Sequence, residues 1–254
     1  GYIGFNFLDP ILKDKNVRLA FAHLVHREEI NKKFAEGLNN LATSPVPVGT
    51  KQSPDRKPIE FSPAKAKDLL TKAGWADTDK NGVLDKVING KKTDLKLTFI
   101  YANKDSEKQW TIVKEDCKKA GIDLELKLLE WNSFIKTVDE RKMQLWAMGW
   151  GGGDVEGDPK QIWHSSSAAK GGSNYGSYSN PEVDKLIDQG RGELDPAKRT
   201  AIFKKAYTLI ADDVPYVFLF NRKFEYYAIS NKVKSPGDTF KYDFGYRTWW
   251  SAQP

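Results

Sequence analysis

Residues 95–128 read LKLTFIYANKDSEKQWTIVKEDCKKAGIDLELKL, and this stretch decides the fold class. Apolar and polar residues alternate over 95–101 and again over 122–128, a pattern that is typical of strands. Between them, residues 106–120 carry apolar side chains at helical spacing and are followed by a glycine, so they are predicted to form a helix. A strand, a helix and a strand of these lengths predict a parallel pair joined by a right-handed crossover.

A second crossover follows directly. Residues 131–141 are predicted to form a helix that leads to the apolar run 145–148, LWAM, which is typical of a buried strand. Two successive crossovers indicate an α/β domain. Ligands of such sheets bind beyond the carboxyl ends of the strands, so the residues after Met148 are the first place to expect a binding site.

Residues 149–159 read GWGGGDVEGDP and lose almost all side-chain bulk at three consecutive glycines. Glycine permits backbone angles that other residues avoid and allows another backbone to approach closely. With Trp150 before the glycines and Asp154 and Asp158 after them, the loop suits a ligand that has a peptide backbone or an ammonium group. A flexible glycine-rich turn is the alternative. A phosphate cradle is disfavoured because the lysine and Ser/Thr of a P-loop are missing.

Composition limits the class of protein. The 254 residues suffice for one large domain or two modest ones, and no run of about 18 apolar residues predicts a membrane-spanning helix. The net charge is +6, but the lysines are scattered among acids, so we expect a solvated surface and no nucleic-acid binding. Cys117 is the only cysteine, so a disulfide within the chain is impossible.

Other elements are predicted along the rest of the chain. Apolar residues at helical spacing predict one continuous helix from Asn16 to Phe34. Five prolines between Thr43 and Pro63 indicate an extended connection that runs over a surface. The remaining predictions are strands over 2–7, 214–220 and 224–229, and helices over 64–73, from 181 to 189, and from 196 onward.

A possible calcium loop lies between the helix at 64–73 and the first crossover. Asp77, Asp79 and Asn81, followed by a glycine, match the first half of such a loop, with Asp85 as a further acid. The position that should supply a bidentate glutamate is Ile88, and an Asn-Gly pair follows it. A polar hairpin whose Asp and Asn side chains bond to their own backbone is the stronger interpretation.

Several short motifs, in this order and spacing, resemble the family 5 extracellular solute-binding proteins, which are oligopeptide-, dipeptide- and nickel-binding receptors of ABC importers. The motifs are GFN (4–6), NVRLA (16–20), REEI (27–30), AKAKDLL (64–70), AGW (73–75), GW (149–150), DP (158–159), IWHSS (162–166), YSNPEVDKLI (178–187) and VPYVFLF (214–220).

The resemblance implies a lobe of the type II periplasmic binding protein fold, α/β with a mixed, mostly parallel sheet and flanking helices. Family members have two lobes and about twice this length. Residues 1–221 would therefore form the second, C-terminal ligand-binding lobe, and residues 222–254 would return to a first lobe that is absent from this sequence.

The resemblance also implies a ligand site. In peptide-binding relatives, the segment that begins at the Gly-Trp pair lies alongside the extended peptide, and an acid a few residues later holds its α-ammonium. Asp154 matches that acid, with Asp158 as the alternative, whereas Ala147 and Met148 stand where relatives place an arginine for the peptide carboxylate. The candidate ligand-binding residues are Gly149, Trp150, Gly151, Gly152, Gly153, Asp154, Asp158, Trp146, Trp163 and Tyr178.

The leading hypothesis is a receptor lobe for peptides, with no catalytic residues and no cofactor. An oligosaccharide receptor of the same family is the alternative, in which Trp131, Trp146, Trp150 and Trp163 stack on sugar rings. A hydrolase that uses Asp154 and Asp158 as a carboxylate pair is more distant. The expected partners are a small peptide or another small solute and an ABC permease. The expected location is periplasmic or on the cell surface, with membrane contact only through a lipid anchor or the permease.

Overall fold

The computed structural model describes residues 1–151, 157–169, 171–222, 230, 232–234 and 250–251. They belong to two units, Gly1–Arg222 and Lys223–Pro254. In the second unit, β10 (Val233–Lys234) pairs antiparallel with β11 (Trp250–Ser251). The predicted strand over 224–229 lies outside the described residues.

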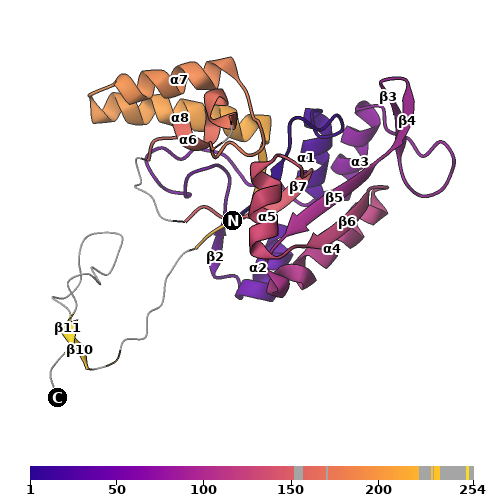
Figure 1. Ribbon diagram of the computed structural model, residues 1–254, viewed down its shortest axis with the longest axis horizontal. Coiled ribbons are helices and arrows are strands. Elements are labelled where there is room, and N and C mark those ends of the chain that lie inside the picture. Colours follow the sequence, from indigo (N-terminus) through magenta and orange to yellow (C-terminus); the bar gives the residue numbers. More distant parts are fainter. Residues whose placement is uncertain (152–156, 170, 223–229, 231, 235–249, 252–254) are drawn as a thin grey trace. The chain divides into compact units, whose positions relative to one another are not determined.

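A five-stranded sheet forms the centre of the first unit (Figure 1). In sheet order its strands are β6 (Asp123–Leu128), β5 (Lys96–Tyr101), β7 (Leu145–Met148), β1 (Tyr2–Phe5) and β8 (Tyr216–Phe218). The pairs β6–β5 and β5–β7 are parallel, whereas β1 runs antiparallel to both β7 and β8. Four strands therefore share one direction, and the prediction of a mixed, mostly parallel sheet with two crossovers is confirmed.

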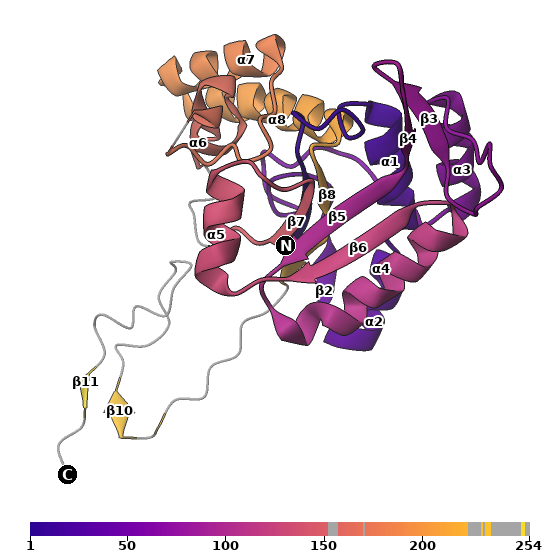
Figure 2. The same ribbon diagram turned by 45° about the vertical axis from the view of Figure 1, so that its right-hand side comes forward.

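Helices cover both faces of the sheet (Figures 1 and 2). They are α1 (Lys15–Leu24), α2 (Arg27–Ala35), α3 (Pro63–Lys72), α4 (Glu107–Lys119), α5 (Trp131–Asp139), α6 (Lys160–Trp163), α7 (Pro181–Gly192) and α8 (Pro196–Asp213), with the 3₁₀ turns η1 (Lys104–Ser106) and η2 (Ser165–Ala168). Two short ribbons complete the unit, β2 (Asn39–Leu41) with β9 (Phe220–Arg222) and β3 (Asp85–Ile88) with β4 (Lys91–Asp94).

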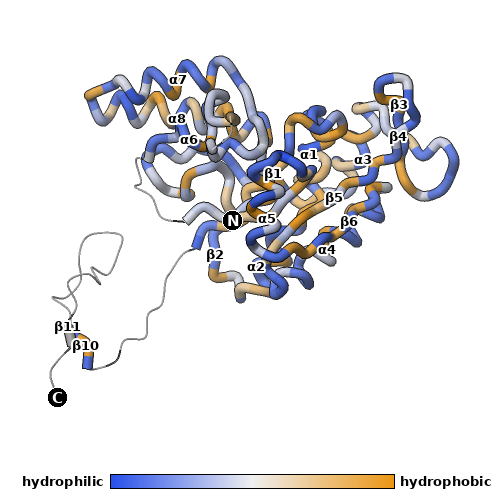
Figure 3. Tube along the Cα trace, viewed as in Figure 1, coloured by the Kyte–Doolittle hydropathy of each residue, from blue (hydrophilic) through white to orange (hydrophobic). Residues whose placement is uncertain are grey.

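The core has two parts because side chains of a strand alternate between its faces. Ile3, Phe99 and Leu145 belong to a cluster with α1, α3 and α4. Tyr2 and Trp146, their neighbours in sequence, belong to a second cluster with α5, α7 and α8. In Figure 3 the hydrophobic colour follows β5 through the interior, whereas the β3–β4 hairpin is largely hydrophilic. Among the described residues, no helix combines the length and hydropathy that crossing a membrane requires.

Capping residues explain where several helices begin. Ser62 accepts a hydrogen bond from the N–H of Lys65, with Pro63 as the first residue of α3. Asn180 and Asp195 cap α7 and α8 in the same way, each ahead of a proline. These caps fix the chain direction at each helix start without help from distant residues.

The prediction of one continuous helix from Asn16 to Phe34 is wrong. The structure has two helices, α1 and α2, because Val25 takes an extended conformation, with φ −91° and ψ 99°. The break turns Arg27 at the start of α2 into the interior, where it is 4% exposed. The predicted strand over 214–220 is likewise divided, into β8 in the main sheet and β9, which pairs with β2.

Candidate ligand-binding site

The end of β7 leads into backbone groups that no described strand pairs with. Asn6 donates its N–H to Gln144 O (3.0 Å), so alternate residues from Gln144 to Met148 bond toward β1. By the same alternation, the backbone N–H and C=O of Gly149 point toward the side of β5. They find no strand there, because β5 ends at Tyr101 and the chain turns into η1. No described residue hydrogen bonds to the backbone of residues 149–151.

The space around this segment is open. Among the described residues, a Cβ built on Gly151 would meet no atom within 4 Å beyond its chain neighbours, and one built on Gly149 would only approach Gly1 Cα at 4.0 Å. Gly149, Trp150 and Gly151 are all exposed. The backbone of residues 149–151 is therefore open to solvent directly after β7, and strand addition by an extended peptide needs such unpaired backbone groups.

A pocket of about 330 Å³ opens beside the segment. Its aromatic residues come from β1, the β7 end, α6, α8 and β8, and the connection after β2 also contributes to the lining. The lining residues are Gly1, Tyr2, Ala42, Ser44, Pro45, Val46, Pro47, Trp150, Gly157, Asp158, Pro159, Ile162, Trp163, Tyr207, Tyr216, Phe218 and Asn221.

The aromatic residues form a stack that supports Trp150. The rings of Tyr2 and Tyr216 are 3.9 Å apart and nearly parallel, at 5°. The Trp150 ring lies 6.2 Å from Tyr2 and 6.0 Å from Tyr175, again nearly parallel, and keeps 42% of its surface exposed. The guanidinium of Arg141 lies 5.3 Å from the centre of the Tyr175 ring. Burial raises the pKa of Tyr2 and Tyr216 well above the usual tyrosine value, so both phenols stay neutral.

Asp158 lies at the edge of the pocket with both carboxylate oxygens in use. Oδ2 accepts a hydrogen bond from Arg191 Nε (2.8 Å), and Oδ1 accepts one from the Lys160 N–H (2.9 Å). The first contact ties the loop to α7 and compensates the negative charge, while the second fixes the start of α6. A ligand ammonium would therefore have to compete with Arg191 for this carboxylate.

The other predicted site residues are distributed unevenly. Trp163 lines the pocket, although it is only 3% exposed. Trp146 is fully buried beneath the pocket, with its ring edge-on to Tyr216 at 6.0 Å. Tyr178 is 2% exposed, and its hydroxyl donates to Asp213 Oδ2 (2.7 Å). Burial places Trp146 and Tyr178 in the core instead of the pocket, and Gly152, Gly153 and Asp154 lie outside the described residues.

Sequence analysis missed Tyr2, Tyr207, Tyr216 and Phe218 as pocket residues. They come from one end of the chain, from α8 and from the last strand of the sheet, so only the strand order brings them together. Pro45, Val46 and Pro47 also line the pocket, and they belong to the proline-rich connection that was predicted to run over a surface at 43–63.

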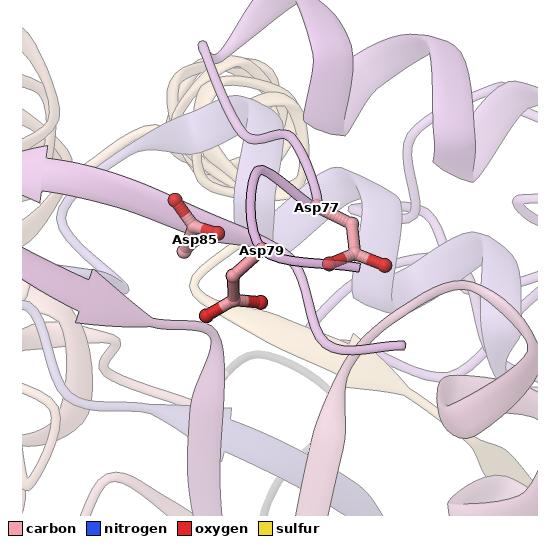
Figure 4. Close-up of side chains that lie close together, drawn as sticks. All are labelled: Asp77, Asp79 and Asp85. Carbon is pink, nitrogen blue, oxygen red and sulfur yellow. The ribbon is translucent and has the colours of Figure 1, made fainter. Parts of the chain in front are cut away.

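The candidate calcium loop forms a compact acidic turn (Figure 4). One carboxylate oxygen from each of Asp77, Asp79 and Asp85 lies within 4.8 Å of the others. Lys92 Nζ lies 2.7 Å from Asp79 Oδ2 and 3.5 Å from Asp85 Oδ2, and it lowers the pKa of Asp79. Asp77 accepts the N–H groups of Asn81 and Gly82, both at 3.0 Å. The predicted hairpin, formed by β3 and β4, is confirmed. The ammonium group of Lys92 already pairs with two of the three carboxylates.

Calcium is expected to stabilise this chain little. Because Lys92 already pairs with Asp79 and Asp85 and occupies the space between them, millimolar CaCl₂ should shift the melting temperature by less than about 1 °C, as followed by circular dichroism. Lys92→Met frees the carboxylates and is the matched variant, in which calcium should raise the melting temperature. A rise of several degrees in the unmodified chain would show that calcium displaces the lysine.

Comparison with known proteins assigns the family. The model of the bacterial extracellular solute-binding proteins, family 5 Middle, matches residues 1–174. The chain belongs to this family. The oligopeptide-binding protein AppA of Bacillus subtilis is 34% identical over 224 residues, which are 86% of this chain and 40% of that protein. The dipeptide-binding protein of Escherichia coli is 26% identical over 86% of this chain and 39% of its own length.

Solved structures of family members agree with the fold. The structure of Bacillus subtilis AppA in complex with a nonapeptide has a TM-score of 0.84 at 29% identity, and covers 99% of this chain and 50% of that one. The oligopeptide-binding protein of Thermus thermophilus, complexed with a pentapeptide, has a TM-score of 0.77 at 26% identity, over 87% of this chain and 41% of its own. The predicted type II periplasmic binding protein fold is confirmed. The chain spans about 40% of the length of the curated relatives.

Proposed function

We propose that this chain is the peptide-contacting part of an extracytoplasmic receptor that delivers peptides to an ABC permease. The observation that carries the proposal is the backbone of residues 149–151, to which no described residue hydrogen bonds. This segment follows β7 at a level where the neighbouring strand β5 has already ended. It is supported by membership of a family of extracellular solute-binding proteins and by relatives named for binding oligopeptides and dipeptides. We place the complete protein in the periplasm or on the cell surface.

The mechanism we propose is capture by addition of a strand. An extended peptide lies beside β7, and its backbone N–H and C=O groups bond to those of Gly149 and Gly151. Such bonds are independent of the peptide's side chains and suit a receptor for varied sequences. Residues 1–221 would act as one lobe and residues 222–254 would lead back to the other, so that both close over the ligand by hinge motion.

Asp154 is our candidate for the contact to the peptide ammonium. In Asp158, the alternative acid, one carboxylate oxygen accepts a hydrogen bond from Arg191 and the other accepts one from the Lys160 N–H. The same contacts weaken the hydrolase alternative, since Asp158 is not free to act as an acid or a base. The oligosaccharide alternative loses one of its four rings, because Trp146 is fully buried, whereas Trp131 and Trp150 remain exposed.

The test uses the complete receptor and two versions of one peptide, with a free or an acetylated amino terminus. Asp154→Asn should weaken binding of the free-amine peptide by about ten- to a hundredfold, because a charge-assisted hydrogen bond is lost. Binding of the acetylated peptide should change by less than about threefold, since it carries no ammonium. Titration calorimetry measures both affinities.

Asp158→Asn is the matched control. It should affect the two peptides alike, because the Asp158 carboxylate pairs with Arg191 and not with the peptide ammonium. Equal losses for the two peptides in Asp154→Asn would remove Asp154 from the role. A thermal-shift panel in which oligosaccharides stabilise the receptor and peptides do not would overturn the proposed function itself.

A further inference from the structure

We propose that the pocket beside the 149–151 segment receives one bulky, uncharged side chain of the bound peptide, aromatic or aliphatic, and discriminates against charged side chains. The inference rests on the proposed function and deepens it, because backbone pairing alone would accept any sequence. It concerns only the pocket walls that the structure describes.

Size and position favour a single side chain as the occupant. A volume of about 330 Å³ lies at the lower end of the ~300–1,000 Å³ that ligand pockets usually have, so it suits one bulky side chain better than an extended peptide of several residues. Trp150 belongs to both parts of the site, because its backbone lies in the free segment and its ring lines the pocket. A peptide paired with the segment therefore passes the pocket opening.

The chemistry of the walls favours an apolar group. The lining includes the aromatic residues Tyr2, Trp150 and Trp163 and the apolar residues Pro45 and Val46. The tyrosines are neutral, because burial raises their pKa. Apolar and aromatic walls gain free energy by covering an apolar side chain and lose it by desolvating a charged one.

The charged groups around the pocket already have partners. Asp158 is the single charged side chain among the described residues that line the pocket, and Arg191 compensates it at 2.8 Å. The amino group of Gly1, which also lines the pocket, donates to Phe220 O (3.1 Å). A ligand lysine would have to share Asp158 with Arg191, and a ligand glutamate would meet the carboxylate. Neither charged residue finds a free partner, so both are disfavoured against a neutral one of similar size.

The first test is a peptide series on the complete receptor. In a pentapeptide of alanines, each position is replaced in turn by Phe, Leu, Lys or Glu, and calorimetry gives the affinities. At one position, Phe and Leu should bind about tenfold or more tighter than Ala, and Lys and Glu weaker than Ala. Peptides that bind with no such position would overturn this inference and leave the proposed function standing. If no peptide binds, the proposed function fails.

The second test locates the preference. Val46→Glu adds a charge to the pocket wall and should bring the Phe-to-Ala affinity ratio from about tenfold to near one. Val48→Glu is the matched control, because Val48 lies two residues along the same connection, is 44% exposed and does not line the pocket. It should leave the ratio unchanged. A ratio that Val46→Glu does not alter, or that both variants alter alike, would show that the selecting surface lies elsewhere.

Discussion

Replacing Arg27 by methionine is expected to lower the free energy of unfolding of the chain by about 4 kcal/mol. Arg27 is 4% exposed, and Nη1 donates to Ala42 O (3.0 Å) and Phe218 O (2.6 Å) while Nη2 donates to Ile59 O. Burial lowers the pKa of Arg27 to about 10, so it stays charged at neutral pH. Methionine fills similar space but leaves three carbonyls unpaired in the interior.

Urea unfolding followed by circular dichroism measures this effect. Arg27→Lys should recover part of the loss, because one ammonium reaches fewer carbonyls than the planar guanidinium does. Arg56→Met is the matched control, since Arg56 only pairs with Asp212 near the surface (2.9 Å) and should cost less than about 1 kcal/mol. A loss of under about 1 kcal/mol for Arg27→Met would show that water replaces the guanidinium.

Arg27 also explains why the break between α1 and α2 was not foreseen. Local periodicity supports one helix across Val25, because the apolar spacing continues on both sides of it. The carbonyls that attract the guanidinium come from Ala42, Ile59 and Phe218, which lie far along the chain. The gain from satisfying these buried groups therefore overrides helical propensity, and no local window of sequence contains that information.

The elements that were predicted correctly have local causes. The hairpin of β3 and β4 follows from Asn89 and Gly90, whose φ values of 50° and 78° suit the tight turn of a hairpin. The start of α3 follows from Ser62 and its proline. The glycine-rich end of β7 was likewise evident from composition. The pocket was not, because Tyr2 and Tyr216 stack only once β1 is inserted between β7 and β8.

Gly4→Ala is expected to destabilise the chain by about 3 kcal/mol, a large effect for one methyl group. A Cβ at this position would lie 2.3–2.5 Å from three atoms of the Trp146 ring. The ring cannot move away easily, because it is fully buried and lies edge-on to Tyr2 (6.3 Å) and Tyr216 (6.0 Å). Displacing it would also disturb the tyrosine pair in the pocket wall.

A double variant separates this clash from a simple loss of glycine. Trp146→Phe shortens the ring, so Gly4→Ala/Trp146→Phe should be at least about 1 kcal/mol more stable than the sum of the single effects predicts, as measured by urea unfolding. Gly192→Ala is the matched control, because no atom lies within 4 Å of its Cβ position, and it should change stability by less than about 0.5 kcal/mol. Additive losses in the cycle would mean that the methyl group clashes with backbone instead of the ring. The glycine of the GFN motif would then be needed for the conformation of β1, and Trp146 would not be its cause.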